Sequence, residues 1–408
     1  MAKTRPEARV KALPAPAGGR TTTLFAPVLL LCLGMILLAG PNPATGSLAS
    51  QPAPAEAEAP PLLEDDLNLA GLISAAETSL RIMAGRDGAA LFTLCGREYT
   101  LARLRLGLED FTAAARRAAN PAELAAYVAE NYILCPSGGE PWAGRAFLTG
   151  YYAPELAGSL EKSERYRYPL YAPPPDLVRR DGQAGRLVAG RLEPYWSRAE
   201  IENGNLLAGH ELVYLKDPLA VFSLHVQGSG RIRLPDGSQR PVGYAAKSGR
   251  EYRSIGRLLV AEGRLSLADA DWPGIQRYLR AHPEELTRVL HHNESYIFFR
   301  WGRPDEPGPL GSFGLPLTAG RSLALDQAHY PPGMPAYLAG TKPEITPDDE
   351  IAAWRPFGRF VFNQDSGSAI RGPGRADLFW GSDRAAEIAA GVTRHPADLF
   401  LLLPRDPA

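Results

Sequence analysis

The sequence predicts a mainly β protein in which one β-rich domain is inserted into another, with helices toward the N-terminal side. Three observations support this fold class. Alanine- and leucine-rich segments over 67–84 and 112–131 have the composition of helices. From Arg145 onward, apolar and polar residues alternate with a period near two, which is typical of strands. Helical patterns return over 266–292 before strands resume, so one β region interrupts the other.

Local signals place the individual elements. Within 112–131, Asn120 is a candidate N-cap, with Pro121 in the first turn and Glu123 three residues after the cap. The later helical pair breaks around His282. The expected strands are RAFLTGYYAPEL, ELVYLKD, LAVFSLHVQGSGRIRL and RPVGYAAK, then SYIFFRW, GRSLALD, MPAYLAG, FGRFVFNQD and DLFWG. We therefore assign 64–151 and 297–405 to the outer domain and 152–296 to the inserted domain.

Composition argues against nucleic acid as a partner. The 408 residues carry a formal net charge of −1, with no excess of basic residues. Their hydrophobic fraction of 45% is ordinary for a globular protein. The length suits two domains, or one domain with a large insertion.

The first 40 residues predict export. A basic leader precedes an apolar run over Leu24–Gly40 that is about as long as the shortest membrane spans. Two interpretations remain, a cleaved signal peptide or an uncleaved anchor that attaches the chain to the membrane. A buried core helix fits less well, because a Pro/Ala-rich linker follows over 41–63. Cys32 follows three leucines, a poor lipoprotein cleavage site. We expect the folded domains in the periplasm, on the outer side of the cytoplasmic membrane.

Cysteine and histidine spacing predicts no metal site, and we expect no cofactor. Cys95 and Cys135 either pair as a disulfide in an oxidising compartment or remain two buried thiols. His291 and His292 are adjacent, so they diverge on a helix and do not form a metal pair. The sequence contains no H-E-x-x-H pattern and no phosphate-binding loop.

Three aspartates are candidates for acid–base chemistry on a glycosidic bond, which is commonly broken with carboxylates. Asp326, Asp365 and Asp377 each lie next to the end of a predicted strand. Each can instead cap a turn, the commonest role of an aspartate beside glycine. Phe379 and Trp380 follow Asp377 and offer a sugar-stacking face or apolar cover. Apolar cover would raise the pKa of an aspartate toward the range that a general acid needs.

Seven blocks in fixed order carry a resemblance to a known family. They are FLTGYYAPELAGS, YPLYAPPPDLV, FSLHVQGSGRIRLPDG, VGYAAKSGREYRSIG, NESYIFFR, GPLGSFGLPLTAGRSLALD and QDSGSAIRGPGRADLFWG. Over about 145–404 the chain resembles the membrane-bound lytic murein transglycosylase A family, peptidoglycan-cleaving enzymes with a C-terminal 3D domain.

This resemblance implies a fold and a mechanism. The fold is a double-psi β-barrel domain into which a second small β-barrel is inserted, with a glycan groove between them. The three family aspartates fall on Asp326, Asp365 and Asp377. Asp377 matches the catalytic acid and base, and Asp365 is the supporting carboxylate. Family members cleave the β-1,4 bond between N-acetylmuramic acid and N-acetylglucosamine without water, leaving a 1,6-anhydro sugar.

Further residues are candidates for glycan contacts. Gln227, Gly228 and Ser229, expected at the end of a strand, suit a saccharide groove or form a tight turn. Arg253 and Ser254 either bind sugar or buttress the barrel. The remaining candidates are Tyr151, Tyr152, Asp326 and Trp380, and strand alternation allows only one of the two tyrosines to face the groove.

The chain departs from the family pattern at three positions. Ala153 stands where many members carry a polar residue, and Ser368 replaces a usual glycine. His225 lies at a position that varies among members.

Three function classes remain from the sequence. They are a lytic transglycosylase, a hydrolase (muramidase) on the same scaffold and a non-catalytic glycan-binding protein. The expected partners are peptidoglycan strands and cell-envelope synthesis or division complexes.

Overall fold

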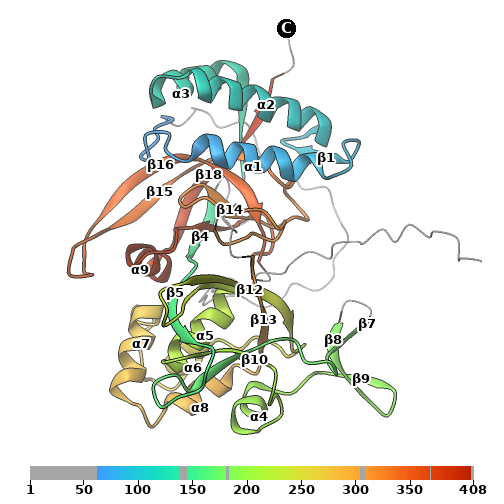
Figure 1. The fold of residues 1–408 in the computed structure, drawn as a ribbon. Helices are drawn as coiled ribbons and strands as arrows, with labels where there is room; N and C mark the ends of the chain where they lie inside the picture. The colour runs from blue at the N-terminus through green and yellow to red at the C-terminus, as the bar shows by residue number, and fades with distance from the viewer. Residues whose placement is uncertain (1–61, 138–144, 181–182, 304–307, 368, 406–408) are drawn as a thin grey trace, which may run out of the picture.

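The computed structural model describes residues 62–137, 145–180, 183–303, 308–367 and 369–405. Two domains lie one above the other, with the first three helices covering the outer domain on the side away from the insertion (Figure 1). The predicted leader and almost all of the linker fall in 1–61, outside the described residues. Ser368 also lies outside the described residues. In the part of the chain that is described, no helix is both long enough and apolar enough to cross a membrane.

The outer domain is a closed six-stranded barrel. Around the barrel run β15 (Pro335–Ile345), β16 (Ile351–Asp365), β14 (Ser322–Ala324), β17 (Arg375–Phe379), β4 (Arg145–Tyr151) and β18 (Arg394–Pro404). The ring closes because β15 also pairs with β18, and β3 (Tyr132–Pro136) adds to β18 outside it. The pairs β14–β16 and β17–β4 are parallel, and the other pairs are antiparallel. The mainly β fold is confirmed, and the mixed pairing is compatible with a double-psi barrel.

Helices α1 (Leu72–Ala84), α2 (Leu101–Arg117) and α3 (Pro121–Asn131) pack their apolar faces on the barrel core. The helix predicted over 112–131 is therefore two helices, separated just before Asn120. The predicted cap is confirmed, because Asn120 Oδ1 accepts a hydrogen bond from the Glu123 N–H at 3.0 Å. A disulfide joins Cys95, between β1 (Leu91–Leu94) and β2 (Arg97–Thr100), to Cys135 on β3, so the paired alternative is correct.

The inserted domain has a six-stranded sheet and its own helices. Its strands, in sheet order, are β13 (Ile297–Trp301), β12 (Gln239–Lys247), β11 (Ser229–Arg233), β5 (Glu155–Ser159), β10 (Glu211–Leu215) and β6 (Tyr168–Tyr171). The end strands β13 and β6 contact each other, so the sheet curls into a partly open barrel. A small sheet of β7 (Val178–Arg180), β8 (Gln183–Val188) and β9 (Arg191–Glu193) projects from this domain (Figure 1).

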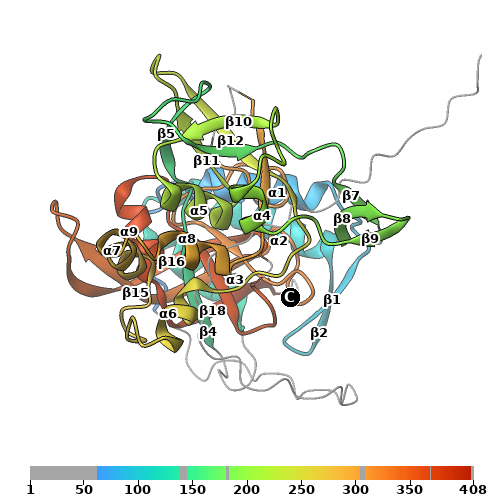
Figure 2. The same cartoon turned by 90° about the horizontal axis from the view of Figure 1, so that it is seen from below.

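Helices fill one side of the inserted domain. They are α4 (Arg198–Asn203), α5 (Pro218–Gln227), α6 (Ile255–Ala261), α7 (Trp272–Ala281) and α8 (Leu286–His292). Viewed from below, α7 lies beside α9 (Arg384–Val392) of the outer domain, so the two domains touch there (Figure 2).

Two sequence assignments differ from the structure. The segment LAVFSLHVQ was assigned to a strand but forms most of helix α5. Asp217 caps this helix, because its side chain accepts a hydrogen bond from the Leu219 N–H. Nearly all of its side chains are buried, so no clean period of either kind appears in the sequence. Strand β13 pairs with β12 of the inserted sheet, so the chain returns to the barrel after Trp301 rather than at residue 297.

Candidate active site

Strand β4 brings two polar side chains to the candidate aspartates. Thr149 and Tyr151 are two residues apart on this strand, so they point to the same side. Thr149 Oγ1 donates a hydrogen bond to Asp377 Oδ1 at 2.8 Å. The Tyr151 hydroxyl donates to Asp365 Oδ2 at 2.9 Å. One strand therefore holds both carboxylates in place.

The barrel register puts Asp365 and Asp377 at one level. Both residues pair with Ala324 of β14, from the strands on its two sides. Neighbouring strands are about 4.8 Å apart, so the two Cα atoms are separated by roughly 10 Å. The register shifts between Leu323 and Ala324, because Gln364 is an extra residue in β16. This bulge aligns Asp365 with Asp377, and bulges are common next to active sites.

Asp365 is fully buried and accepts hydrogen bonds at both oxygens. Its Oδ1 accepts from the backbone N–H groups of Ser312 and Ser366, both at 2.8 Å. Burial raises the pKa of Asp365 to about 6, although these bonds and the one from Tyr151 lower it in part. Burial thus favours the protonated form of Asp365 up to a higher pH than in an exposed aspartate.

Asp326 has a turn-capping role. Its Oδ1 accepts a hydrogen bond from the Ala328 N–H at 3.1 Å. Its Oδ2 accepts from the Gly372 N–H at 2.7 Å, in the loop between the other two aspartates. Asp326 therefore supports the loop that connects Asp365 to Asp377, and Arg371 of that loop lies 3.9 Å from its Oδ1.

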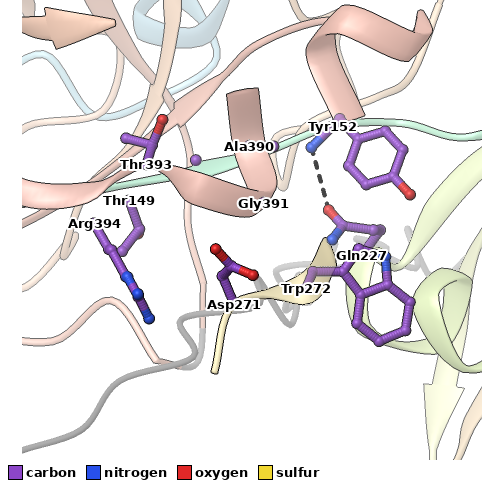
Figure 3. A pocket seen from close by; sticks show the side chains of 10 residues that line it. Thr149, Tyr152, Gln227, Asp271, Trp272, Ala390, Gly391, Thr393 and Arg394 are labelled. Atoms are coloured by element: carbon purple, nitrogen blue, oxygen red, sulfur yellow. Dashed lines mark hydrogen bonds between the residues drawn. The ribbon is translucent and has the colours of Figure 1, made fainter. Parts of the chain in front are cut away.

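Tyr152 and Gln227 join the two domains above β4. The Tyr152 N–H donates to Gln227 Oε1 at 3.2 Å (Figure 3). The Tyr152 hydroxyl lies 3.2 Å from Ser223 Oγ. Tyr151 instead faces Asp365, so the two tyrosines diverge as strand alternation predicts. Gln227 ends α5, and Gly228 caps the helix with a φ of 78°, a left-handed conformation that suits glycine. Gln227 and Gly228 therefore end a helix rather than the expected strand, and their contact with a glycan stays a prediction.

A pocket at this junction is bordered by Thr149, the residue that donates a hydrogen bond to Asp377. Thr149 lines it from β4, and Asp271 and Trp272 face it from the inserted domain, opposite Ala390 and Gly391 of α9 (Figure 3). Asp271 also caps α7, because its Oδ1 accepts from the Gly274 N–H at 2.8 Å. Burial raises the pKa of Asp271.

A second cleft at the junction is walled largely by glycine backbone. Ser229 and Tyr244 line it from the inserted domain, together with Arg300. Its glycines are Gly228, Gly230, Gly243, Gly302, Gly308, Gly311 and Gly314. A Cβ on Gly311 would lie 3.5 Å from Asp365 Cγ, so the cleft comes close to that carboxyl. Backbone without side chains lets a bulky ligand approach closely.

The structure does not bring Arg253 and Ser254 to the aspartates. Arg253 is exposed and pairs with Glu294 at 2.7 Å. Ser254 caps α6, where its hydroxyl accepts from the Arg257 N–H. Both make these contacts within the inserted domain, and a role in sugar binding stays a prediction.

Trp380 packs against the outer face of the site. An added Cβ on Gly150 would lie only 2.4 Å from Trp380 Nε1, so the absence of a side chain at Gly150 permits this packing. The indole also lies edge-on to Phe357, with ring centroids 6.2 Å apart. Trp380 is thus half-buried in the outer domain.

Two of the positions that depart from the family pattern are buried. Ala153 donates its N–H to Gly381 O at 2.9 Å, so its backbone ties the domain crossing to the end of β17. His225 is a core residue whose Nδ1 lies 2.8 Å from Arg198 Nη1. Burial lowers the pKa of His225 well below its ordinary value, so it is neutral.

Sequence reasoning did not single out Thr149, Ser312 or Asp271. A signal existed for Thr149, because it lies two residues before Tyr151 on a predicted strand. Ser312 contributes only its backbone N–H, so its side chain gives no sign of the contact. Within the described ranges, no three potential metal-binding side chains gather at one point.

Comparisons with known proteins match both domains of the chain. A model of the MltA specific insert domain matches residues 147–300, and a model of the 3D domain matches residues 321–403. The membrane-bound lytic murein transglycosylase A of Escherichia coli K12 is 30% identical over 262 residues, which cover 64% of this chain. Its Vibrio cholerae counterpart is 28% identical and covers 63% of this chain. The matches span 66% and 65% of these relatives, just under two thirds of their length.

Solved structures extend the similarity. A membrane-bound lytic murein transglycosylase from Agrobacterium tumefaciens has a TM-score of 0.66 and 33% identity, covering 83% of this chain and 93% of its own. LtgG, a lytic transglycosylase of Burkholderia pseudomallei, has a TM-score of 0.55 and 31% identity, covering 83% of this chain and 91% of its own. Escherichia coli MltA with bound chitohexaose shares the fold, at a TM-score of 0.63 and 23% identity, covering 84% and 93%. This chain belongs to the membrane-bound lytic murein transglycosylase A family.

Proposed function

We propose that this chain is a lytic transglycosylase that cleaves the β-1,4 bond between N-acetylmuramic acid and N-acetylglucosamine in peptidoglycan. Family membership supports the reaction class. The observation that carries the site assignment is the row formed by Asp365, Ala324, Asp377 and Thr149 across four neighbouring strands. It places two carboxyl groups on one level of the barrel, at the junction between the domains.

Asp377 acts first as the acid and then as the base. Its protonated carboxyl gives a proton to the glycosidic oxygen, which leaves as the 4-hydroxyl of N-acetylglucosamine while the C1–O bond breaks. The 6-hydroxyl of the same muramyl residue attacks C1, and its proton returns to Asp377. A 1,6-anhydro ring results, and neither water nor a second nucleophile is consumed. The attack is intramolecular, so it gains from proximity.

Asp365 supports this chemistry by charge and position. Its oxygens accept hydrogen bonds from Ser312, Ser366 and Tyr151, which hold the carboxyl group in one orientation. A carboxylate fixed by three donors suits stabilisation of the positive charge that develops at C1. Asp326 holds the connecting loop.

The glycan enters along the junction between the domains. Ser229 and the glycine backbone around it contribute to one wall, and Tyr152 and Gln227 close the other. Asp377 is fully buried in this arrangement, so the junction widens when substrate binds. The domains act in the periplasm on peptidoglycan strands, in contact with cell-envelope complexes, and the N-terminal segment either directs export or stays as an anchor.

Asparagine variants test the assignment. Asp377→Asn keeps the shape of the side chain but cannot exchange an acidic proton, so cleavage of purified sacculi should fall by about 10⁴-fold or more. Asp365→Asn should lose less activity, and Asp326→Asn should act mainly through stability. Mass spectrometry of the products separates the reaction classes, because an anhydro end lacks one water. Reducing ends would indicate a muramidase, and intact strands with retained binding would indicate a glycan-binding protein. An active Asp377→Asn beside a dead Asp365→Asn would show that the roles are reversed.

A further inference from the structure

The inserted domain contains a large cavity on the side away from the barrel. It opens between α4, β6, β10 and α8, and the labels α4 and α8 lie at the far end of this domain from the outer domain (Figure 1). Four tyrosines line it, together with Asn203, Asn205 and Glu211; the tyrosines are Tyr168, Tyr171, Tyr214 and Tyr296. None of these residues takes part in the site described above.

Helix α5 separates this cavity from the catalytic junction. Pro218 at the start of the helix lines the cavity, whereas Gln227 at its end contacts Tyr152. Ten helical residues span about 15 Å, so the two sites lie on opposite sides of the domain core. Leu224 and Val226 of this helix are buried, which closes the path between the sites. A ligand in the cavity therefore does not reach Asp377.

The polar groups of the cavity are available to a ligand. Neither Tyr171 nor Tyr214 donates its hydroxyl to another residue of the described chain. Burial, with the charge of Glu211 nearby, raises the pKa of Tyr171 to about 12, so its hydroxyl keeps its proton at neutral pH. Tyrosines of this kind offer an apolar ring and a hydrogen-bonding tip. Asn203 and Asn205 add amide donors and acceptors at the rim.

The charges around the cavity are largely compensated. Glu202 is paired with Arg198 at 2.9 Å and with His291 at 3.0 Å. Among the lining side chains, the positive charges of Lys162 and Arg167 equal in number the negative charges of Glu202 and Glu211. The site therefore lacks the net charge that would favour a carboxylate or an ammonium group. A neutral, amphipathic ligand with hydroxyl and amide groups fits it best.

We propose that this cavity is a second, non-catalytic saccharide-binding site that takes an N-acetylated glycan strand. The proposal rests on the proposed function for the identity of the polymer in the cell. The site would hold the enzyme on the sacculus while the junction acts on a strand. Its ligand class follows from the tyrosine rings, the amides and the balanced charge.

Calorimetry with tetra-N-acetylchitotetraose tests the proposal. The full chain carrying Asp377→Asn avoids turnover and should bind two oligosaccharides. Adding Tyr214→Ala should weaken one of the two sites by about tenfold. The matched control is Tyr166→Ala, on the adjacent segment but not in the cavity lining, and it should change nothing. If Tyr214→Ala does not fold, Tyr214→Phe and Asn205→Ala replace it, and each should still weaken that site measurably.

The outcomes separate this proposal from the proposed function. The proposal is overturned if the affinity of the second site is unchanged by Tyr214→Ala and its replacement variants. It is also overturned if the parent chain binds a single oligosaccharide whose affinity these variants do not change. Binding of Nα-acetyl-lysine amide in place of the oligosaccharide would assign the cavity to a peptide amine and also overturn it. In the chain with native Asp377, Tyr214→Ala should reduce cosedimentation with sacculi several-fold while cleavage of short soluble strands stays unchanged. Failure of the catalytic assignment would instead appear as retained cleavage by Asp377→Asn, whatever the stoichiometry.

Discussion

Replacing Asp365 by asparagine should stabilise the barrel at neutral pH. The amide has nearly the same shape, and its oxygen can still accept from Ser312 and Ser366. Its nitrogen then faces the Tyr151 hydroxyl, which accepts a hydrogen bond as readily as it donates one. The substitution therefore preserves the contacts and removes an ionisable group from a fully buried position.

The size of the effect follows from the pKa. Burial raises the pKa of Asp365 from 3.8 to about 6, so the folded state keeps its proton where the unfolded chain has lost it. Stability from this proton is fully present below about pH 4 and is lost as pH rises to about 6. Each pH unit in this window corresponds to about 1.4 kcal/mol, so the cost of ionising the buried carboxyl reaches about 3 kcal/mol above pH 6. At pH 4.5 this destabilisation of the folded state is about 1 kcal/mol.

Urea unfolding at pH 4.5 and pH 7.5 measures this difference. Asp365→Asn should exceed the parent in free energy of unfolding by about 3 kcal/mol at pH 7.5 and by about 1 kcal/mol at pH 4.5. Asp236→Asn is a surface control and should show no such gain at pH 7.5. An Asp365→Asn variant that is less stable than the parent at pH 7.5 would refute the argument, because the carboxylate would then be stabilising in its ionised form.

Three further perturbations act through packing, the disulfide and a helix cap. Gly150→Ala should lower the free energy of unfolding by about 1–3 kcal/mol and shift the fluorescence of Trp380, because the new methyl group overlaps the indole; unchanged melting would contradict the close packing. Reducing the Cys95–Cys135 disulfide, with a sequence separation of 40, should cost about 4 kcal/mol in the chain-entropy model, measured by denaturant unfolding with and without reductant. Asn120→Ala should cost about 1 kcal/mol by the same assay, and Asn120→Ser should recover most of it.

Features that depend on local sequence could be predicted, namely strands with alternating apolar and polar residues and one helix cap. Asp377 and Thr149 lie on strands whose apolar pattern is evident, and Asn120 was identified as a cap from its neighbours alone. Helix α5 escaped because it is buried on nearly all sides, which removes the helical period. Asp217 followed by Pro218 was the available signal, since this pair is typical of a helix start.

Long-range pairing could not be predicted from local pattern. The bulge at Gln364, which aligns Asp365 with Asp377, depends on which strand β16 pairs with. Arg321 lies fully buried in the barrel because Asp65, 256 residues earlier, binds its guanidinium through both carboxylate oxygens. A buried arginine is stable only with such a partner, and the sequence separation hides the pair.

If Asp377 is the acid and base of the proposed reaction, its burial bears on which product is released. Tyr152 leads the chain from β4 into the inserted domain and is tied to α5 through Gln227 and Ser223. Each such bond contributes about 0.5–1.5 kcal/mol, so breaking these two contacts costs about 1–3 kcal/mol, an amount that glycan binding can supply. When the strand fills the widened junction, it takes the place that water would otherwise occupy. A site that excludes water favours attack by the substrate's own 6-hydroxyl over hydrolysis. Under the proposed function, the same junction would therefore limit access to Asp377 and would favour the anhydro product over a reducing end.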